Sequence, residues 1–193
     1  GKDTAYTDQY DAALLFPILR NKARATGEKE GAETGGLPFF GTDLWTAFEI
    51  SWLNQQGLPQ VAIGEFIFPC TSDAIIASKS FKLYLNSFNQ TQYPSMDAVQ
   101  AVMQADVSAA CGAGIGVQLY RVGDYNEIRP VAESAGTCID QRSVSVDTYQ
   151  PNAGFLQADS SALVSETVYS HLLRTNCPVT DQPDWASVYI SYK

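Results

Sequence analysis

Cys177 and Asp184 are the residues of this chain whose types and spacing could carry out covalent chemistry. Both lie in the run Thr175-Asn176-Cys177-Pro178-Val179-Thr180-Asp181-Gln182-Pro183-Asp184-Trp185. A thiolate can attack an electrophilic carbon, and a neighbouring carboxyl can protonate the adduct that results. The run falls between two predicted strands, so both side chains can point into one pocket. The pattern alone is weak, because a cysteine among four is more often a buried small hydrophobe than a nucleophile.

The composition of the chain bounds its class of function. Of its 193 residues, 45% are hydrophobic and 17% are charged, which is typical of a globular protein. The net charge of −9 argues against a nucleic-acid partner, since phosphate backbones bind basic surfaces. No apolar run is long enough to span a membrane, so no membrane partner is expected. Lys79 and Lys82 could still converge on an anionic cofactor.

The cysteines and the single histidine limit the possible kinds of site. Cys70, Cys111, Cys138 and Cys177 are widely spaced, and no export signal is recognisable. We therefore expect reduced thiols and a cytosolic protein. Without a Cys-x-x-Cys pair, and with His171 as the only histidine, no metal site is expected. The same shortage of histidine argues against Ser-His and Cys-His triads built within one subunit.

Apolar periodicity and turn residues predict a first module with α and β layers. The expected elements are strands over residues 45–53 and 60–68, helices over residues 80–88 and from Ser95 to Gly112, and strands over residues 114–121 and 127–135. Ser95 is the expected N-cap of the second helix. This order corresponds to an α+β fold, in which a four-stranded antiparallel sheet carries two helices on one face.

The remainder of the chain predicts a second module that stops early. A strand over residues 143–149 precedes a hairpin over residues 167–174 and 186–192, which repeats the opening hairpin with residues 166–169 aligned to 45–48. We therefore expect three parts, an N-terminal arm and mobile loop over 1–37, a complete module over 38–135 and a partial one over 136–193. A half-module leaves an open sheet edge, so we expect the chain to be a fragment or a truncated product.

A longer motif makes the cysteine run specific. It is the stretch Ala77-Ser78-Lys79-Ser80-Phe81-Lys82-Leu83-Tyr84-Leu85-Asn86-Ser87-Phe88-Asn89-Gln90-Thr91. Together the two stretches resemble the NADPH-dependent 7-cyano-7-deazaguanine reductases, the nitrile reductases of queuosine biosynthesis, in their long two-module type. The similarity extends over nearly the whole chain, through Gly41-Thr42-Asp43-Leu44-Trp45, Ser51-Trp52-Leu53-Asn54, Gly136-Thr137-Cys138-Ile139-Asp140 and Ser170-His171-Leu172-Leu173.

The resemblance implies a fold, a reaction and a role for particular residues. It implies the tunnelling fold and the reduction of a nitrile to a primary amine by two NADPH molecules, through a covalent thioimide on Cys177. Asp184 would be the proton donor, and we expect the adjacent Pro183 and Trp185 to provide the apolar surroundings that keep it protonated. Sheets with open edges associate side by side, so a homo-oligomer, at least a dimer, is expected.

The resemblance also assigns the binding residues. Ser78 and Lys79 would contact NADPH, where a hydroxyl and a cation at a helix start suit phosphate. Ile76, Ala77 and Ser78 would contact 7-cyano-7-deazaguanine, while His171 would be structural. The family has Glu where this chain has Ala77, and losing that buried acceptor should cost roughly 1–3 kcal/mol of binding. The family's later His-Glu pair and Arg-Gly segment fall beyond Lys193.

Two other functions remain open at this point. A non-catalytic tunnelling-fold protein, acting as a ligand-binding or assembly module, is favoured by Ala77 and the short C-terminal part. A pterin- or GTP-processing cyclohydrolase of the same fold is disfavoured by the shortage of zinc ligands.

Overall fold

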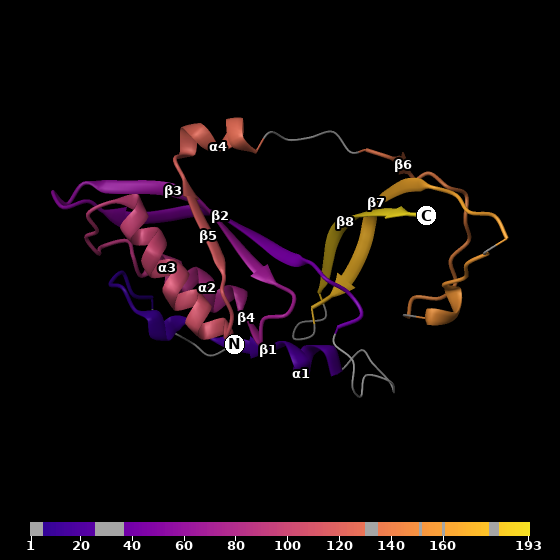
Figure 1. Cartoon of the computed structure of the whole chain (residues 1–193), viewed down its shortest axis with the longest axis horizontal. Helices are drawn as coiled ribbons and strands as arrows, with labels where there is room; N and C mark the ends of the chain where they lie inside the picture. The colour runs from indigo at the N-terminus through magenta and orange to yellow at the C-terminus, as the bar shows by residue number, and fades with distance from the viewer. Residues whose placement is uncertain (1–5, 26–36, 130–134, 151, 160, 178–181) are drawn as a thin grey trace. The chain divides into compact units, whose positions relative to one another are not determined.

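The computed structural model describes residues 6–25, 37–129, 135–150, 152–159, 161–177 and 182–193 of the chain. The chain divides into two compact units, Gly1–Pro130 and Val131–Lys193, which we call unit 1 and unit 2 and describe separately (Figure 1). Within the described residues, no helix is both long and apolar enough to cross a membrane.

Unit 1 is built on a three-stranded antiparallel sheet. Its order is β2 (Thr42–Leu53), β3 (Pro59–Pro69) and β5 (Gly116–Tyr120). The predicted opening hairpin is confirmed, and its turn is tightened by Gly57, whose φ of 78° suits a residue without Cβ. Gly64 of β3 is packed against core side chains, and a Cβ there would come within 2.5 Å of the Ile50 side chain. The sheet therefore admits no larger residue at this position without repacking.

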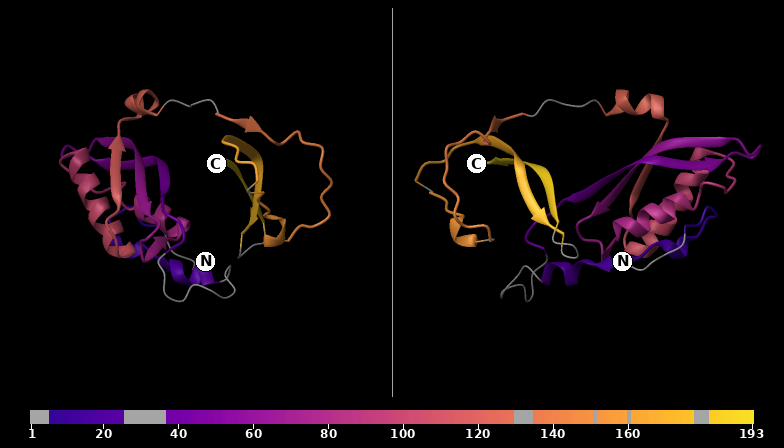
Figure 2. Two further views of the ribbon diagram at one scale, coloured as in Figure 1. Left: turned by 45° about the vertical axis from the view of Figure 1, so that its right-hand side comes forward. Right: turned by 180° about the vertical axis from the view of Figure 1, so that it is seen from behind.

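Two helices cover one face of this sheet (Figures 1 and 2). They are α2 (Ser78–Asn86) and α3 (Met96–Cys111). As predicted, the Ser95 hydroxyl caps α3 by accepting the Ala98 N–H, and Gly112 ends it in the left-handed conformation. The fully buried side chains that join helices to sheet include Ile50, Phe66, Phe68, Tyr84, Phe88, Val99, Met103 and Val107. The burial of this apolar surface is the main stabilisation of unit 1.

The strand predicted over residues 127–135 is wrong at its start, because residues 122–128 form helix α4 (Val122–Ile128). Residues 130–134 lie outside the described part of the chain. The sheet of unit 1 therefore shows three strands among the described residues and not the predicted four. The sequence pattern missed the long-range partner of this segment, since Arg129 at the end of α4 bonds to Glu65 of β3.

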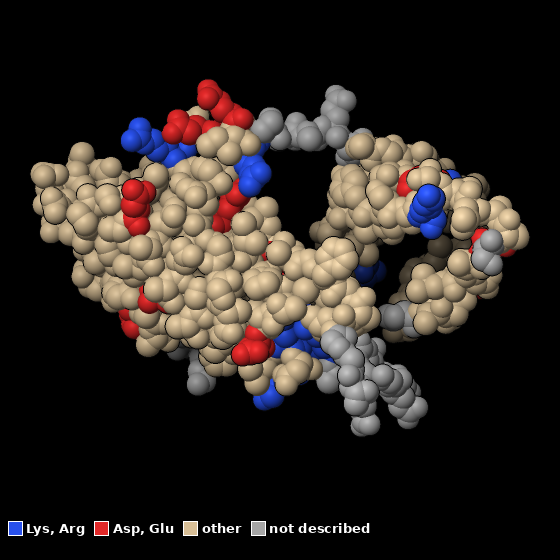
Figure 3. Space-filling view, viewed as in Figure 1, with Lys and Arg blue, Asp and Glu red and all other residues tan. Residues whose placement is uncertain are grey.

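Glu65 anchors α4 to the sheet. Its side chain is 2% exposed and receives two hydrogen bonds from Arg129, Nε to Oε1 at 2.9 Å and Nη2 to Oε2 at 3.0 Å. The hydroxyls of Tyr120 and Tyr125 donate to the same carboxylate at 3.2 and 3.3 Å. Hydrogen bonding from Arg129 lowers the pKa of Glu65, against the opposing effect of burial. Figure 3 shows acidic and basic side chains side by side over α4.

The N-terminal segment packs against the rest of unit 1. It contains the 3₁₀ turn η1 (Ala12–Leu14), β1 (Pro17–Leu19) and α1 (Arg20–Ala25), and β1 pairs with β4 (Ala74–Ile76). The Tyr10 and Tyr84 hydroxyls both donate to Asp106 Oδ2 on α3, at 2.9 and 2.6 Å. Burial and this carboxylate raise the pKa of Tyr10 to about 12. Residues 26–36 of the predicted mobile loop lie outside the described part.

Unit 2 is a second, more open sheet. It contains β6 (Thr137–Cys138), η2 (Ala153–Phe155), β7 (Glu166–Asn176) and β8 (Pro183–Tyr192), with β6 parallel to β7 and β7 antiparallel to β8. The strand predicted over residues 143–149 is wrong, since this stretch is irregular and exposed, and the preceding residues supply the third strand instead. No described residue of unit 2 is buried, so its sheet has no core of its own.

The hairpins of the two units close in the same way. One residue pair ends each ladder, namely Leu53 with Pro59 and Asn176 with Pro183. The next residue then donates its backbone N–H across the loop, Asn54 to Leu58 O at 3.0 Å and Cys177 to Gln182 O at 2.8 Å. Asn54 in unit 1 therefore occupies the position of Cys177 in unit 2, and Gln60 occupies that of Asp184.

A break in register supports this correspondence. It lies between Ala47 and Ile50 in β2 and between Ser170 and Leu173 in β7, at the same distance from the turn in both hairpins. Val168 then corresponds to Trp45, two residues beyond the alignment predicted from sequence. The repeated element is thus a bulged hairpin, and its bulge and turn define it better than its side chains do.

We predict that Glu65→Gln lowers the free energy of unfolding by about 1–3 kcal/mol at pH 7, because the buried anchor loses its charge-assisted bonds. Since the folded pKa of Glu65 is lowered, its contribution is present above the ordinary carboxyl pKa and is lost as the pH falls through the folded value. Urea unfolding of both proteins at decreasing pH should therefore show the difference narrowing.

The matched control for this prediction is Glu127→Gln, which removes an exposed carboxyl from α4. It should leave stability within about 0.5 kcal/mol of the parent. Equal losses in the two variants, or a difference that widens in acid, would contradict the anchoring role of Glu65.

Candidate active site

Cys177 lies at the tip of the β7–β8 hairpin. Its backbone N–H bonds to Gln182 O across the loop, so it lies opposite Gln182 and extends the ladder beyond the pair Asn176–Pro183. The thiol is half-buried. Residues 178–181 of the loop lie outside the described part of the chain.

The register places Cys177 and Asp184 on the same face of this hairpin. Asp184 pairs with Thr175, and Cys177 is two residues beyond Thr175 along β7. Side chains alternate between faces along a strand, and directly paired residues share a face. Cys177 and Asp184 are therefore diagonal neighbours, a relation in which Cα atoms lie roughly 7–8 Å apart. A small electrophilic carbon and its attached nitrogen can fit between two such groups.

Pro183 and Trp185 do not enclose Asp184 as the sequence predicted. Both are adjacent to it in the strand, so they project from the opposite face. Trp185 is 61% exposed, and its ring lies 5.9 Å from the Arg174 guanidinium. Asp184 itself is exposed within unit 2. The prediction overlooked the strand alternation, which turns neighbours in sequence away from each other.

A second polar cluster of unit 2 was not expected from the sequence. Asp140 accepts the His171 backbone N–H at 3.2 Å, and His171 Nδ1 lies 2.6 Å from the Ser187 hydroxyl. The Ser170 hydroxyl, followed by the His171 N–H and the Cys138 thiol, lowers the pKa of Asp140. These contacts join β7 to β8 and to the segment after β6. His171 is held by the hairpin itself, and its structural role stays a prediction.

The binding residues predicted in unit 1 lie together at the start of α2. Ile76 ends β4 and lies in the core, with 1% of the whole residue exposed. Ala77 is the N-cap and provides no side-chain cap. Ser78 and Lys79 form the exposed first turn. Within the described residues no acceptor bonds the backbone N–H groups of residues 78–80, an arrangement that suits an anion.

The N-terminal segment positions this helix start. The Ala77 N–H donates to Phe16 O at 2.9 Å, and the Phe16 N–H donates to the Ser80 hydroxyl at 3.1 Å. That hydroxyl in turn donates to Ala77 O at 2.8 Å. The N-terminal segment therefore bonds the Ala77 backbone N–H and the Ser80 hydroxyl. It leaves the backbone N–H groups of the first turn of α2 without an acceptor. This contact joins residues more than sixty positions apart and has no local sequence signal.

The remaining thiols range from buried to exposed. Cys111 is fully buried on α3, and burial raises its pKa to about 11, which makes it a poor nucleophile. Cys138 is exposed and Cys70 is half-buried. Over the described ranges, no three His, Cys, Asp or Glu side chains gather into a possible metal site.

Comparison with known proteins identifies relatives over the whole chain. The family described as "Nitrile reductase, 7-cyano-7-deazaguanine-reductase N-term" matches residues 6–119. Curated relatives named NADPH-dependent 7-cyano-7-deazaguanine reductase come from Burkholderia orbicola and Paraburkholderia xenovorans, both 51% identical over 100% of this chain and 69% of the relative. One from Chromobacterium violaceum is 50% identical over 100% of this chain and 67% of the relative.

We predict that Ala77→Ser raises the free energy of unfolding by about 0.5–2 kcal/mol, because a serine hydroxyl would satisfy one N–H of the uncapped first turn. Chemical denaturation measures this change. The control is Ala101→Ser, which places the same side chain on the exposed middle of α3. There serine should lower stability slightly. A loss of stability at position 77 would contradict the uncapped helix start.

Proposed function

The chain belongs to the family of NADPH-dependent 7-cyano-7-deazaguanine reductases, and from this membership we propose that it reduces the nitrile of 7-cyano-7-deazaguanine to a primary aminomethyl group. The observation that carries the proposal is an identity of about half with these reductases over the whole chain. The half-buried Cys177 thiol and the Asp184 carboxyl on one hairpin face support it separately. Such a step supplies the modified base of queuosine in tRNA.

The proposed reaction begins at Cys177. Its thiolate adds to the nitrile carbon, while the nitrogen takes a proton from Asp184 to give a thioimide. NADPH supplies hydride, and two molecules of it with two further protons convert the nitrile to the amine. Because the addition forms one C–S bond that is broken during the reduction, the thiol is regenerated. Asp184, on the same face, can return protons to nitrogen at each stage.

The residues of the β7–β8 hairpin do not by themselves shield the Asp184 carboxyl from water. Its side chain is exposed on unit 2, and Trp185 projects to the other face. A carboxyl that is to carry a proton near neutrality needs desolvation. We propose that the bound planar substrate covers Asp184 and supplies this desolvation. Proton transfer then depends on substrate occupancy.

The start of α2 fits the phosphates of NADPH. Ser78 and Lys79 are exposed, and the N–H groups of the first turn have no acceptor within the described residues. Backbone N–H groups, the helix dipole and a lysine together favour an anion. Ala77 and Ser78, with the backbone of Ile76, would contact the substrate beside it.

We also propose the finer features of architecture. The three-stranded sheet with two helices on one face fits the tunnelling fold, in which subunits join at sheet edges. Among the described residues, strands β2 and β5 end the sheet of unit 1, and β2 carries only a bridge from Leu53 to Gln92 on its outer side. These open edges support a homo-oligomer, at least a dimer. Four cysteines without a disulfide in the structure fit a cytosolic protein.

A second candidate function rests on one residue. Ala77 lacks the carboxylate that the family places before Ser78, which favours a module that binds or assembles without turnover. Calorimetry separates the two functions, because the enzyme must bind both 7-cyano-7-deazaguanine and NADPH. Ala77→Glu should strengthen nitrile binding by roughly 1–3 kcal/mol if this position contacts the substrate.

We predict that the chain forms a covalent adduct with 7-cyano-7-deazaguanine, detected as a mass increase equal to the substrate and a new absorbance band. Cys177→Ala should abolish both signals. Asp184→Asn should retain the thiol but slow adduct formation by about 10²- to 10⁴-fold, the usual contribution of a positioned acid.

The control for this experiment is Cys138→Ala, which removes an exposed thiol of the same unit. It should form the adduct at the parental rate. Absence of adduct in the parent chain, or an adduct that persists in Cys177→Ala, would eliminate the proposed mechanism.

We predict that Lys79→Ala raises the KM for NADPH about tenfold, since it removes one charge-assisted phosphate contact. Lys82→Ala, one turn further along α2, should have a smaller effect because the dipole acts mainly at the first turn. Steady-state kinetics with varied NADPH measure both. A larger effect at Lys82 would place the cofactor elsewhere.

A further inference from the structure

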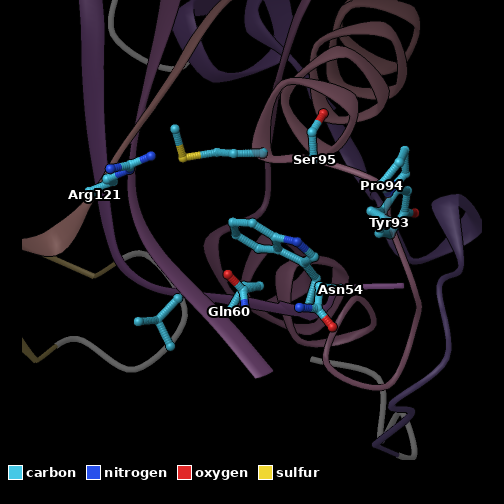
Figure 4. A pocket seen from close by; sticks show the side chains of 9 residues that line it. Asn54, Gln60, Tyr93, Pro94, Ser95 and Arg121 are labelled. Carbon is cyan, nitrogen blue, oxygen red and sulfur yellow. The ribbon is translucent and has the colours of Figure 1, made fainter. Parts of the chain in front are cut away.

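Unit 1 contains a cavity of about 210 Å³ at the turn end of its sheet. It lies between the β2–β3 hairpin, the segment that enters α3 and the end of β5, at the opposite end of β3 from Ala77. Figure 4 shows Arg121 reaching in from one side, with Gln60 and Asn54 along another edge and Tyr93 and Pro94 across from it. The proposed reaction uses none of these residues.

The aromatic side chain of Trp52 lines the cavity and carries a hydrogen-bond donor. Trp52 lines it and is 4% exposed, yet its indole N–H has no acceptor within the described residues. This nitrogen keeps some accessible surface, because it is not among the fully buried side-chain nitrogen and oxygen atoms without a partner. A buried indole N–H normally has a partner. An external acceptor in the cavity would supply one.

Arg121 and Gln60 add complementary groups. The Arg121 guanidinium makes no hydrogen bond or ion pair within the described part of the chain. Gln60 Nε2 donates to Leu58 O and Pro59 O at 3.3 and 2.9 Å, which leaves its Oε1 as an acceptor. The cavity thus presents donors from Arg121 and Trp52 and an acceptor from Gln60.

The position of the cavity in the repeat indicates what kind of ligand it suits. Asn54 and Gln60 occupy the places that Cys177 and Asp184 hold in unit 2, since the two hairpins share their turn closure and bulge. An amide in place of the thiol cannot form a covalent bond to a nitrile. An amide in place of the carboxyl cannot donate a titrating proton. The Asn54 oxygen already accepts the Gln56 and Leu58 N–H groups at 3.0 and 2.9 Å, which leaves its Nδ2 as a donor. An amide nitrogen and the Gln60 oxygen are groups that can hydrogen-bond to the edge of a planar ring.

We propose that this cavity is a second, non-catalytic site that binds a planar nitrogen heterocycle bearing a carbonyl oxygen. Arg121 and the Trp52 N–H would donate to the carbonyl and a ring nitrogen, Gln60 would accept a ring N–H, and the aromatic side chains would contact the ring face. This choice of ligand rests on the proposed function in one respect. The proposed substrate at the corresponding hairpin of unit 2 is also a planar heterocycle.

A phosphate is the less suitable occupant, although the cavity adjoins the start of α3. The Ser95 hydroxyl already caps that helix, and Asp97 in its first turn repels anions. Inorganic phosphate is therefore the comparison ligand in the test.

The test is titration of the ¹⁵N-labelled chain with hypoxanthine, which has the carbonyl and ring nitrogens but no nitrile. The indole signal of Trp52, assigned with Trp52→Phe, and the side-chain amide of Gln60 should shift together and saturate. Arg121→Ala should weaken this binding about tenfold or more, as expected for a lost bond from a charged donor. Lys22→Ala, which removes an exposed cation from α1, should not.

The outcomes distinguish this site from the reaction at Cys177. If Cys177→Ala leaves the Trp52 shifts intact and Arg121→Ala removes them, the second site stands whether or not adduct forms. The proposal is overturned if hypoxanthine leaves the Trp52 and Gln60 signals unchanged, or if Arg121→Ala binds like the parent. It is equally overturned if phosphate produces the same shifts at lower concentration.

Discussion

The antiparallel register of β7 and β8 is the constraint on which the proposed chemistry depends. Pairing of Thr175 with Asp184 and closure of the loop by Cys177 N–H set the thiol and the carboxyl on one face. A shift of one residue in either strand would turn one of the two groups to the opposite face. Loop length and register therefore matter as much as the identities of the two residues. Backbone bonds outside the reacting groups hold this geometry.

The same hairpin occurs twice, with different surroundings and different side chains beside its turn. In unit 1 it is covered by α2 and α3, and its inner side chains are buried. In unit 2 no described residue is buried. The bulge and the closing hydrogen bond recur although the residue that donates the bond is Asn54 in one copy and Cys177 in the other. A thiol and a carboxyl occupy these positions in one copy, and two amides occupy them in the other.

In unit 1, contacts between residues distant in sequence position the start of α2 and helix α4. The hydrogen bonds of the Phe16 backbone to Ala77 and Ser80 fix the start of α2 without capping its first-turn N–H groups. The helix start therefore stays available to an anion. Glu65 fixes α4 against the sheet with four donors, which compensates the cost of burying a carboxylate. In both places a buried or half-buried polar side chain positions a helix, Ser80 for α2 and Glu65 for α4. Exposed apolar contacts alone would hold these helices loosely.

The sequence by itself determined the family, the α+β class, the opening hairpin and the capped helix from Ser95 to Gly112, because these follow from local periodicity, capping residues and long motifs. It also placed a thiol and a carboxyl at a spacing that a hairpin can bring together. Only the tertiary structure decided that residues 122–128 form a helix held by Glu65, and that Trp185 faces away from Asp184. It alone revealed the correspondence of Asn54 with Cys177. These features depend on strand register and on partners tens of residues away, which local propensity does not encode.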